Sequence, residues 1–204
     1  MRNIFSRALH HFRFKVAFDK EKTASRHFKS RVKRVKKSFF DHTVTIRGSR
    51  YLTIGYDTRV LKDASLEIMD SYFDQRFQPA ITIGNHCWIG ARTQLIGAGK
   101  LTIGNDVFVA ADVYITTLNH GMDPQNPTAY GLQPLQIQDV SIGDGCWIGT
   151  KVVILPGVTI GKRSIIGAGS IVTKSVPDYS IAVGNPAKVI KKYDFDKKAW
   201  IRVI

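Results

Sequence analysis

Aliphatic side chains recur every six residues along most of the chain, a spacing that neither a 3.6-residue helix nor a single amphipathic strand produces. One run keeps this register over six consecutive units, at Ile142, Ile148, Ile154, Ile160, Ile166 and Val172. Shorter runs begin at Ile54, Ile83 and Ile103. Glycine often follows the aliphatic residue, and a small side chain often stands four positions after it. The pattern predicts short strands joined by tight corners, with one inward aliphatic residue on each flat face.

Three six-residue units make one triangular coil, so the repeat indicates an all-β solenoid, a parallel β-helix whose coils are buried by stacking. We predict that this β-helix spans residues 44–176. Residues 1–43 are expected to form a basic, partly helical segment. Residues 177–204 are expected to form an extension that ends in a short helix from about Asp194.

Two breaks interrupt the repeat. Residues 70–80 follow the first regular coil, and residues 119–140 form the longest break, with three prolines and two glycines. A loop of that length within a regular solenoid is more often functional than accidental. It carries His120, whose imidazole, with a pKa near ~6.5, suits general-base chemistry at neutral pH.

Charge is concentrated at the N-terminal end. The chain has 30 Lys and Arg residues against 16 Asp and Glu residues, and residues 1–50 alone hold fifteen of the cations and three of the acids. Such a segment is either a solvated arm or a contact for an anionic membrane surface or an anionic polymer. No recognisable nucleic-acid-binding module follows the basic run, so we expect no nucleic-acid partner.

Neither a membrane-spanning apolar stretch nor a secretory signal is visible in the sequence. The two cysteines are too few for a disulfide scaffold. We therefore predict a cytoplasmic protein, with the basic segment as a candidate peripheral contact on the inner face of the membrane. Besides His120, the repeat region holds only His42 and His86, and no closely spaced imidazole pair. A three-imidazole zinc site is therefore not expected, and we predict no metal.

The repeat, the loop with His120, the phrase CWIGTKVVILPGVTIGKRSIIGAGSIVTKSVP and the closing GNPAKVIKK together resemble the hexapeptide-repeat acyltransferases. The similarity covers about residues 44–193 and is nearest to the maltose, galactoside and polysaccharide O-acetyltransferase branch. It implies a left-handed parallel β-helix, a homotrimer with a coenzyme A groove between neighbours, and acetyl-CoA as co-substrate.

The resemblance also assigns roles to residues. It implies that His120 is the general base and that Trp147 lies on the acceptor side, although Trp147 could equally cover a corner of the coil. Asn119 is interpreted either as orienting the His120 ring or as a turn residue. Gln133 is the nearest counterpart of an acidic residue that the galactoside enzymes carry in this loop. The positions matched to the coenzyme A site are Thr150, Ala168, Thr173, Lys174, Lys188 and Lys191.

These features favour an acetyl-CoA-dependent O-acetyltransferase that acts on a sugar hydroxyl. The expected acceptor is a cell-surface polysaccharide or its precursor, and the basic segment would suit an anionic one. Two alternatives stay open at this point. One is an acetyltransferase for a free sugar or an antibiotic, and the other is a non-catalytic β-helix that serves as a scaffold or binding protein.

Overall fold

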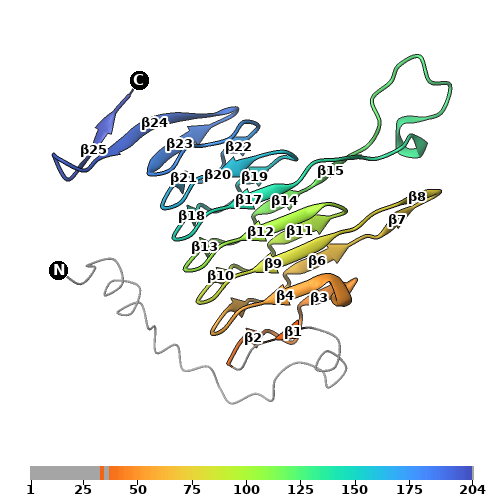
Figure 1. Cartoon of the computed structure of the whole chain (residues 1–204), viewed down its shortest axis with the longest axis horizontal. Helices are drawn as coiled ribbons and strands as arrows, with labels where there is room; N and C mark the ends of the chain where they lie inside the picture. Colours follow the sequence, from red (N-terminus) through yellow and green to blue (C-terminus); the bar gives the residue numbers. More distant parts are fainter. Residues whose placement is uncertain (1–32, 35–36, 204) are drawn as a thin grey trace.

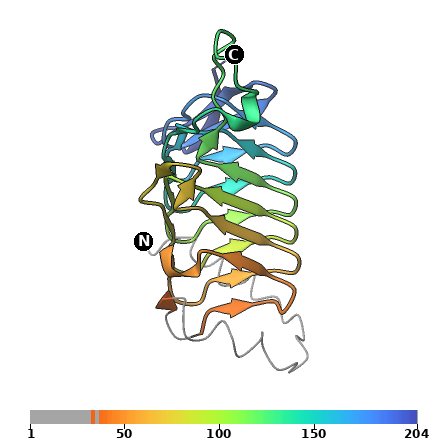
Figure 2. The same cartoon turned by 90° about the vertical axis from the view of Figure 1, so that its right-hand side faces the viewer.

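Stacked triangular coils build the protein, as a computed structural model shows for residues 33–34 and 37–203 (Figure 1, Figure 2). Each coil contributes one short strand to each of three sheets, called sheets A, B and C below. Within each sheet, the strands of successive coils pair in parallel. The predicted architecture, a parallel β-helix, is therefore confirmed.

The strands of each sheet follow one another in the order of the coils. Sheet A contains β1 (Lys33–Arg34), β4 (Leu52–Ile54), β9 (Ala80–Ile83), β12 (Lys100–Ile103), β17 (Val140–Ile142) and β20 (Thr159–Ile160). Sheet C contains β3 (Thr45–Arg47), β6 (Ser65–Ile68), β11 (Gln94–Gly97), β14 (Tyr114–Thr116), β19 (Val153–Ile154) and β22 (Ile171–Val172). Sheet B contains β2 (Phe39–Phe40), β5 (Arg59–Val60), β10 (Trp88–Ile89), β13 (Phe108–Val109), β18 (Trp147–Ile148), β21 (Ile165–Ile166), β23 (Ser180–Gly184), β24 (Ala187–Asp194) and β25 (Ala199–Arg202).

The inward position of each six-residue unit forms the core. In sheet A the inward residues of successive coils are register partners and are at most 1% exposed: Ile54, Ile83, Ile103, Ile142 and Ile160. Paired strands lie ~4.8 Å apart, so each aliphatic side chain contacts the one above and the one below it. Burial of one such side chain contributes about 1.5–3 kcal/mol, which makes stacking the main source of stability.

Amide and carboxylate side chains line the corner between sheets A and B. The Oδ1 atom of Asn85 accepts a hydrogen bond from the Tyr56 amide at 2.8 Å, and Asn105 Oδ1 accepts one from the Asn85 amide at 2.9 Å. Asp144 Oδ1 continues the series by accepting from the Asn105 amide at 2.7 Å. Each side chain thus satisfies a corner amide of the coil below and holds the two coils in register.

The corner between sheets B and C is closed by contact between backbones. A Cβ atom added to Gly90 would lie 2.4 Å from the carbonyl carbon of Ala110 in the next coil. Beside it, Arg92 and Asp112 form a two-point ion pair with N···O distances of 2.6 and 2.8 Å. The hydrogen bond from Arg92 lowers the pKa of the Asp112 carboxyl. Glycine is required here because the next coil occupies the place of a side chain.

Both insertions leave the β-helix at the corner between sheets C and A. The hairpin of β7 (Ser71–Tyr72) and β8 (Gln75–Arg76) follows β6, and the long loop follows β14 (Figure 1). The loop opens and closes with the antiparallel pair β15 (Leu118–Asn119) and β16 (Gln136–Ile137). The two insertions are therefore neighbours on one edge of the prism, although about 50 residues of sequence separate them.

The β-helix begins earlier than the predicted residue 44. Strands β1 and β2 already lie in sheets A and B, and Phe40 is buried in the core. The Ser38 hydroxyl donates a 2.5 Å hydrogen bond to the Gly55 carbonyl of the next coil. Phe40 stands at the inward position that Val60 and Ile89 hold in the next coils, so an aromatic residue in place of an aliphatic one hid this first coil from the repeat pattern. The rest of residues 1–43, for which a partly helical segment was expected, lies outside the described residues.

The predicted C-terminal helix from Asp194 is wrong. The carboxylate of Asp194 accepts hydrogen bonds from the amides of Asp196 and Lys197, which closes a turn, and the chain returns as β25. Tyr193 and Trp200 pair across this hairpin with their ring centroids 5.3 Å apart. The free edge of sheet B offers backbone partners, and β-forming aromatic residues take them. Helix in the described residues is confined to the 3₁₀ turns η1 (Ser49–Tyr51) and η2 (Tyr130–Leu132), and no described helix is long and apolar enough to cross a membrane.

We expect Gly90→Ala to lower the free energy of unfolding by about 1–3 kcal/mol, the usual cost of overpacking a close contact. The added methyl group meets rigid backbone of the next coil, so the two coils must separate locally. Thermal and denaturant unfolding followed by circular dichroism measure the change.

Gly131→Ala is the matched control, because a Cβ atom at Gly131 meets nothing within 4 Å. Its unfolding midpoint should stay within the error of the wild type. Equal stability of the two variants would contradict the close stacking at the B–C corner.

Candidate active site

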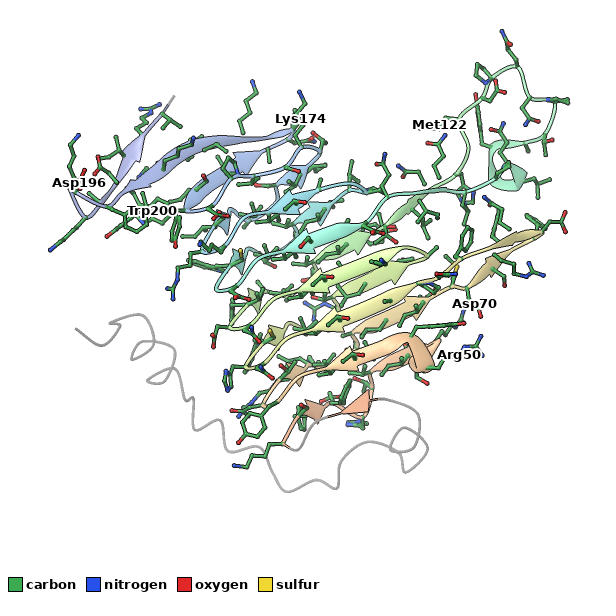
Figure 3. All side chains as sticks on the ribbon, viewed as in Figure 1. Arg50, Asp70, Met122, Lys174, Asp196 and Trp200 are labelled. Carbon is green, nitrogen blue, oxygen red and sulfur yellow. The ribbon has the colours of Figure 1, made fainter. Side chains whose placement is uncertain are left out.

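The long loop presents His120 to solvent immediately after β15. A hollow of about 420 Å³ lies beside it, lined by Asn119, His120, Gly121, Met122 and Tyr130. The exposed fractions of Met122 and Tyr130 are 63% and 57%, so the loop also presents apolar surface that one chain leaves uncovered. Figure 3 labels Met122 where the loop rises from the β-helix.

Gln133 holds the loop together from inside. Its side chain is almost fully buried, and its Oε1 atom accepts a hydrogen bond from the Asp123 amide at 3.0 Å. Its Nε2 donates to the carbonyls of Asp123 and Thr128, both at 3.0 Å. Gly121 packs so closely against this residue that a Cβ atom would lie 2.6 Å from the Gln133 Cβ. Gln133, the nearest counterpart of the acidic residue in the galactoside enzymes, is therefore a neutral side chain that links parts of the loop beside His120.

The His120 imidazole is held in place by an aromatic ring contact. The ring of Tyr72 from the β7–β8 hairpin meets it edge to face, with centroids 5.7 Å apart. Within the described part of the chain no hydrogen bond or ion pair engages the imidazole. Asn119 lies in β15 opposite Gln136, and no hydrogen bond joins its side chain to His120. Both ring nitrogens are thus available to a ligand.

Trp147 lies on a different side of the prism from His120. It starts β18 in sheet B, the face opposite the C–A corner from which the loop leaves. Its side chain is 52% exposed and stands between Phe108 and Ile165, its register partners in the adjacent coils. The core of the prism separates the two residues, so a single chain does not bring them together.

The positions matched to the coenzyme A site fall into two groups. Thr150 and Ala168 share the B–C corner of successive coils, and the Thr150 hydroxyl donates to the Ala111 carbonyl at 2.8 Å. Lys188 and Lys191 lie on β24, which extends sheet B beyond the last coil. These four are on the same side of the molecule as Trp147.

The other two matched positions, Thr173 and Lys174, are exposed at the C–A corner after β22. They therefore lie on the same edge as His120, and Figure 3 shows Lys174 at the end of the coils. The predicted site residues thus form two separate sets, one on the edge of the loop and one on the opposite face.

His86 and the two cysteines are part of the A–B corner. His86 has a left-handed backbone and lies 3.3 Å from the Asp106 carboxylate. Cys87 and Cys146 are buried and free, and each thiol contacts the backbone carbonyl of a neighbouring coil at 3.0 Å. Burial raises the pKa of both thiols to about 11. Among the described residues no cluster of three or more His, Cys, Asp or Glu side chains is placed to hold a metal ion.

Two contacts of the loop were not anticipated from the sequence. Tyr72 and Gln75 of the β7–β8 hairpin both bond to the loop backbone, Tyr72 at Gly131 and Gln75 at Leu135. The signal for them was the break in the repeat at residues 70–80, which indicated an insertion without indicating its partner.

Comparison with known proteins agrees with this architecture. Residues 139–174 match the family model described as bacterial transferase hexapeptide (six repeats), and residues 80–117 match the hexapeptide repeat of succinyl-transferase. Both matches are to hexapeptide repeats of transferases, and both lie within the stacked parallel coils of the structure.

Two relatives and one solved structure show which transferases this chain is similar to. A protein of Escherichia coli named as a lipopolysaccharide biosynthesis O-acetyl transferase, WbbJ, is 39% identical over 107 residues, which are 50% of this chain and 55% of WbbJ. Another, named as a colanic acid biosynthesis acetyltransferase, WcaF, is 35% identical over 112 residues, 55% of this chain and 58% of WcaF. The structure of a maltose O-acetyltransferase from Clostridium difficile is 26% identical, with a TM-score of 0.58, and covers 93% of this chain and 84% of its own. The chain spans little more than half the length of the curated relatives.

The thiols of Cys87 and Cys146 should resist alkylation in the folded protein. Because burial raises their pKa to about 11, both stay protonated at pH 8, whereas an unfolded cysteine has a pKa near ~8.5. Iodoacetamide at pH 8 should modify both residues rapidly in guanidinium and neither in native buffer, as measured by intact mass. Stoichiometric labelling of the native protein would show that a corner of the β-helix opens.

Proposed function

We propose that the protein is an acetyl-CoA-dependent O-acetyltransferase whose acceptor is a sugar hydroxyl of a cell-surface polysaccharide or its precursor. The observation that carries the proposal is the exposed His120 imidazole, which makes no hydrogen bond to the described residues and lies beside a hollow on a loop that Gln133 ties from within. Similarity to WbbJ, WcaF and the maltose O-acetyltransferase supports acetyl-CoA as the donor and a carbohydrate as the acceptor.

The chemistry assigns His120 the role of general base. Its imidazole accepts the proton of the sugar hydroxyl as the oxygen attacks, because a free hydroxyl is too weakly acidic to ionise at neutral pH. Acetyl-CoA supplies the acetyl thioester: the new ester C–O bond replaces the C–S bond, and His120 returns its proton to the departing thiolate. The backbone amide of the exposed Thr150, the position that the resemblance places at the thioester, suits the oxyanion that forms in between.

The same proposal gives the coenzyme two cationic contacts. Lys188 and Lys191 extend sheet B on the Trp147 side, and ammonium groups there suit phosphate and pyrophosphate oxygens. Thr150 and Ala168 at the adjacent corner and Thr173 and Lys174 at the loop edge complete the proposed groove.

We further propose that the active unit is a cyclic homotrimer whose sites each combine two chains. In one chain His120 and Trp147 lie on opposite sides of the prism, so a site that uses both needs a neighbour. The apolar residues Met122, Tyr130 and Leu132 are exposed on the loop, and Phe108 and Trp147 are exposed on sheet B. Docking of the loop of one chain against sheet B of the next would cover both surfaces.

The basic N-terminal segment completes the proposal. Its excess of cations suits peripheral binding to an anionic membrane leaflet on the cytoplasmic side, where each Lys or Arg contributes about 1 kcal/mol. The same charge would attract an anionic polysaccharide acceptor. The segment lies outside the described residues for most of its length, so the sequence alone supports this part.

His120→Ala should lower kcat by about 10²–10⁴-fold, the range for loss of a general base, and leave the KM for acetyl-CoA nearly unchanged. Release of free coenzyme A in the presence of an oligosaccharide acceptor measures the rate. His86→Ala is the matched control, because His86 is also an exposed imidazole but belongs to the A–B corner. Near-wild-type kcat in His120→Ala would refute the mechanism, and no transfer by the wild type to any carbohydrate would refute the function.

Mixing two variants tests the shared site. His120→Ala and Trp147→Ala, co-expressed with different tags, should each be impaired as homotrimers. A purified mixed trimer should recover about one third of the wild-type activity, because one of its three interfaces joins an intact His120 to an intact Trp147. Activity no greater than that of the variants alone would contradict a site built from two chains, as would a monomer in light scattering.

A further inference from the structure

The loop that carries His120 has a narrow attachment to the β-helix. Its β15–β16 base consists of two residue pairs, Leu118 with Ile137 and Asn119 with Gln136, and one further backbone hydrogen bond from the Gln138 amide to the Thr117 carbonyl at 2.9 Å. The buried Gln133 ties parts of the loop to each other, which preserves the shape of the loop without fixing it to the coils. A base of this size leaves the direction of the loop to be set by other contacts.

Gln75 supplies the first of these contacts. Its Oε1 accepts a hydrogen bond from the Leu135 amide at 2.6 Å, and its Nε2 donates to the Leu135 carbonyl at 3.1 Å. One side chain therefore satisfies both backbone groups of a residue that is 60 positions away and 6% exposed. Leu135 precedes β16, so this pairing continues the base of the loop by one residue.

Tyr72 supplies the second contact and reaches the site itself. Its hydroxyl donates to the Gly131 carbonyl in η2, and its ring meets the His120 imidazole edge to face at 5.7 Å. The same side chain thus touches the far part of the loop and the candidate base. Its position determines the distance between them.

The foot of the hairpin is fixed to the coils below. The Asp70 carboxylate accepts a 2.7 Å hydrogen bond from the Tyr51 hydroxyl and forms an ion pair with Arg50 (Figure 3). Arg50 in turn stacks over the Tyr51 ring at 4.7 Å. Hydrogen bonding from Tyr51 and Arg50 lowers the pKa of Asp70, so the carboxylate stays charged at neutral pH. A continuous series of contacts therefore runs from η1 through the hairpin to His120.

We propose that the β7–β8 hairpin is a buttress for the loop and that Tyr72 and Gln75 are positioning residues for His120. This inference rests on the proposed acetyl transfer and adds a determinant of its rate. A displacement of 1 Å at a catalytic group can cost about 10²-fold in rate, so two side chains that set the direction of the loop control kcat without touching the acetyl donor.

Four variants test the buttress in the full-length protein. Gln75→Ala removes the pair to Leu135. Tyr72→Phe removes the hydroxyl bond to Gly131 and keeps the ring against His120, whereas Tyr72→Leu removes both. Asp74→Asn is the matched control, because Asp74 is exposed at the tip of the same hairpin and forms no hydrogen bond or ion pair with the loop.

Loss of the buttress should appear in kcat. We expect about a 3–10-fold decrease for Gln75→Ala or Tyr72→Phe, which each lose hydrogen bonds to the loop backbone, and a larger decrease for Tyr72→Leu. The KM for acetyl-CoA should stay within twofold, and Asp74→Asn should match the wild type in both constants. Equal kcat in all four variants would overturn the inference while leaving the proposed function intact.

Two readouts do not depend on activity. In histidine-labelled protein, the ring proton resonances of His120 should move in Tyr72→Leu and stay close to wild type in Tyr72→Phe, because the aromatic ring current remains. Backbone amides of residues 121–135 should exchange faster in Gln75→Ala. These two measurements would still test the role of the hairpin if the wild type transferred no acetyl group. Unchanged His120 resonances together with unchanged amide exchange would overturn the buttress.

Discussion

In-register stacking of short parallel strands is the constraint on which the rest of this structure depends. Each coil places an aliphatic residue directly over one in the coil below, as Ile83 lies over Ile54 and under Ile103. The spacing of ~4.8 Å leaves no room for a side chain at a corner such as Gly90. A coil can therefore change its outward residues freely, whereas its inward and corner residues are restricted in size.

The same constraint explains where the two insertions lie. Adding residues within a strand would shift every later inward residue off the core, so insertions occur at corners, where the chain can leave and return between the same two strands. Both insertions use the C–A corner, two coils apart, and this placement lets Gln75 and Tyr72 reach the loop. The hairpin and the loop depend on each other because they share an edge.

Much of this fold could be predicted from the sequence because a six-residue period is a direct image of the coil. The inward positions, the corner glycines and the exposed loop with His120 followed from it. The C-terminal hairpin could not be predicted in this way. Its strands form because the free edge of sheet B offers backbone partners, and this long-range pairing overrides the local sequence preference near Asp194. The contacts of Tyr72 and Gln75 could not be predicted either, because they join a side chain to backbone about 60 residues away, where no repeat or spacing marks a partner.

A stack of triangular coils is convex, so it offers flat faces and edges where an enzyme needs an enclosed site. In the proposed site the loop supplies one wall with His120 and sheet B supplies another with Trp147, but within one chain the core of the prism lies between them. In the proposed trimer a second chain would bring these walls together, and both walls expose apolar residues that such a contact would bury. The reach and direction of the loop then determine where the imidazole stands relative to the neighbouring face. In that proposed assembly, the contact between chains and the direction of the loop would both set the distance from His120 to the neighbouring face, and the hairpin would affect the chemistry through the loop alone.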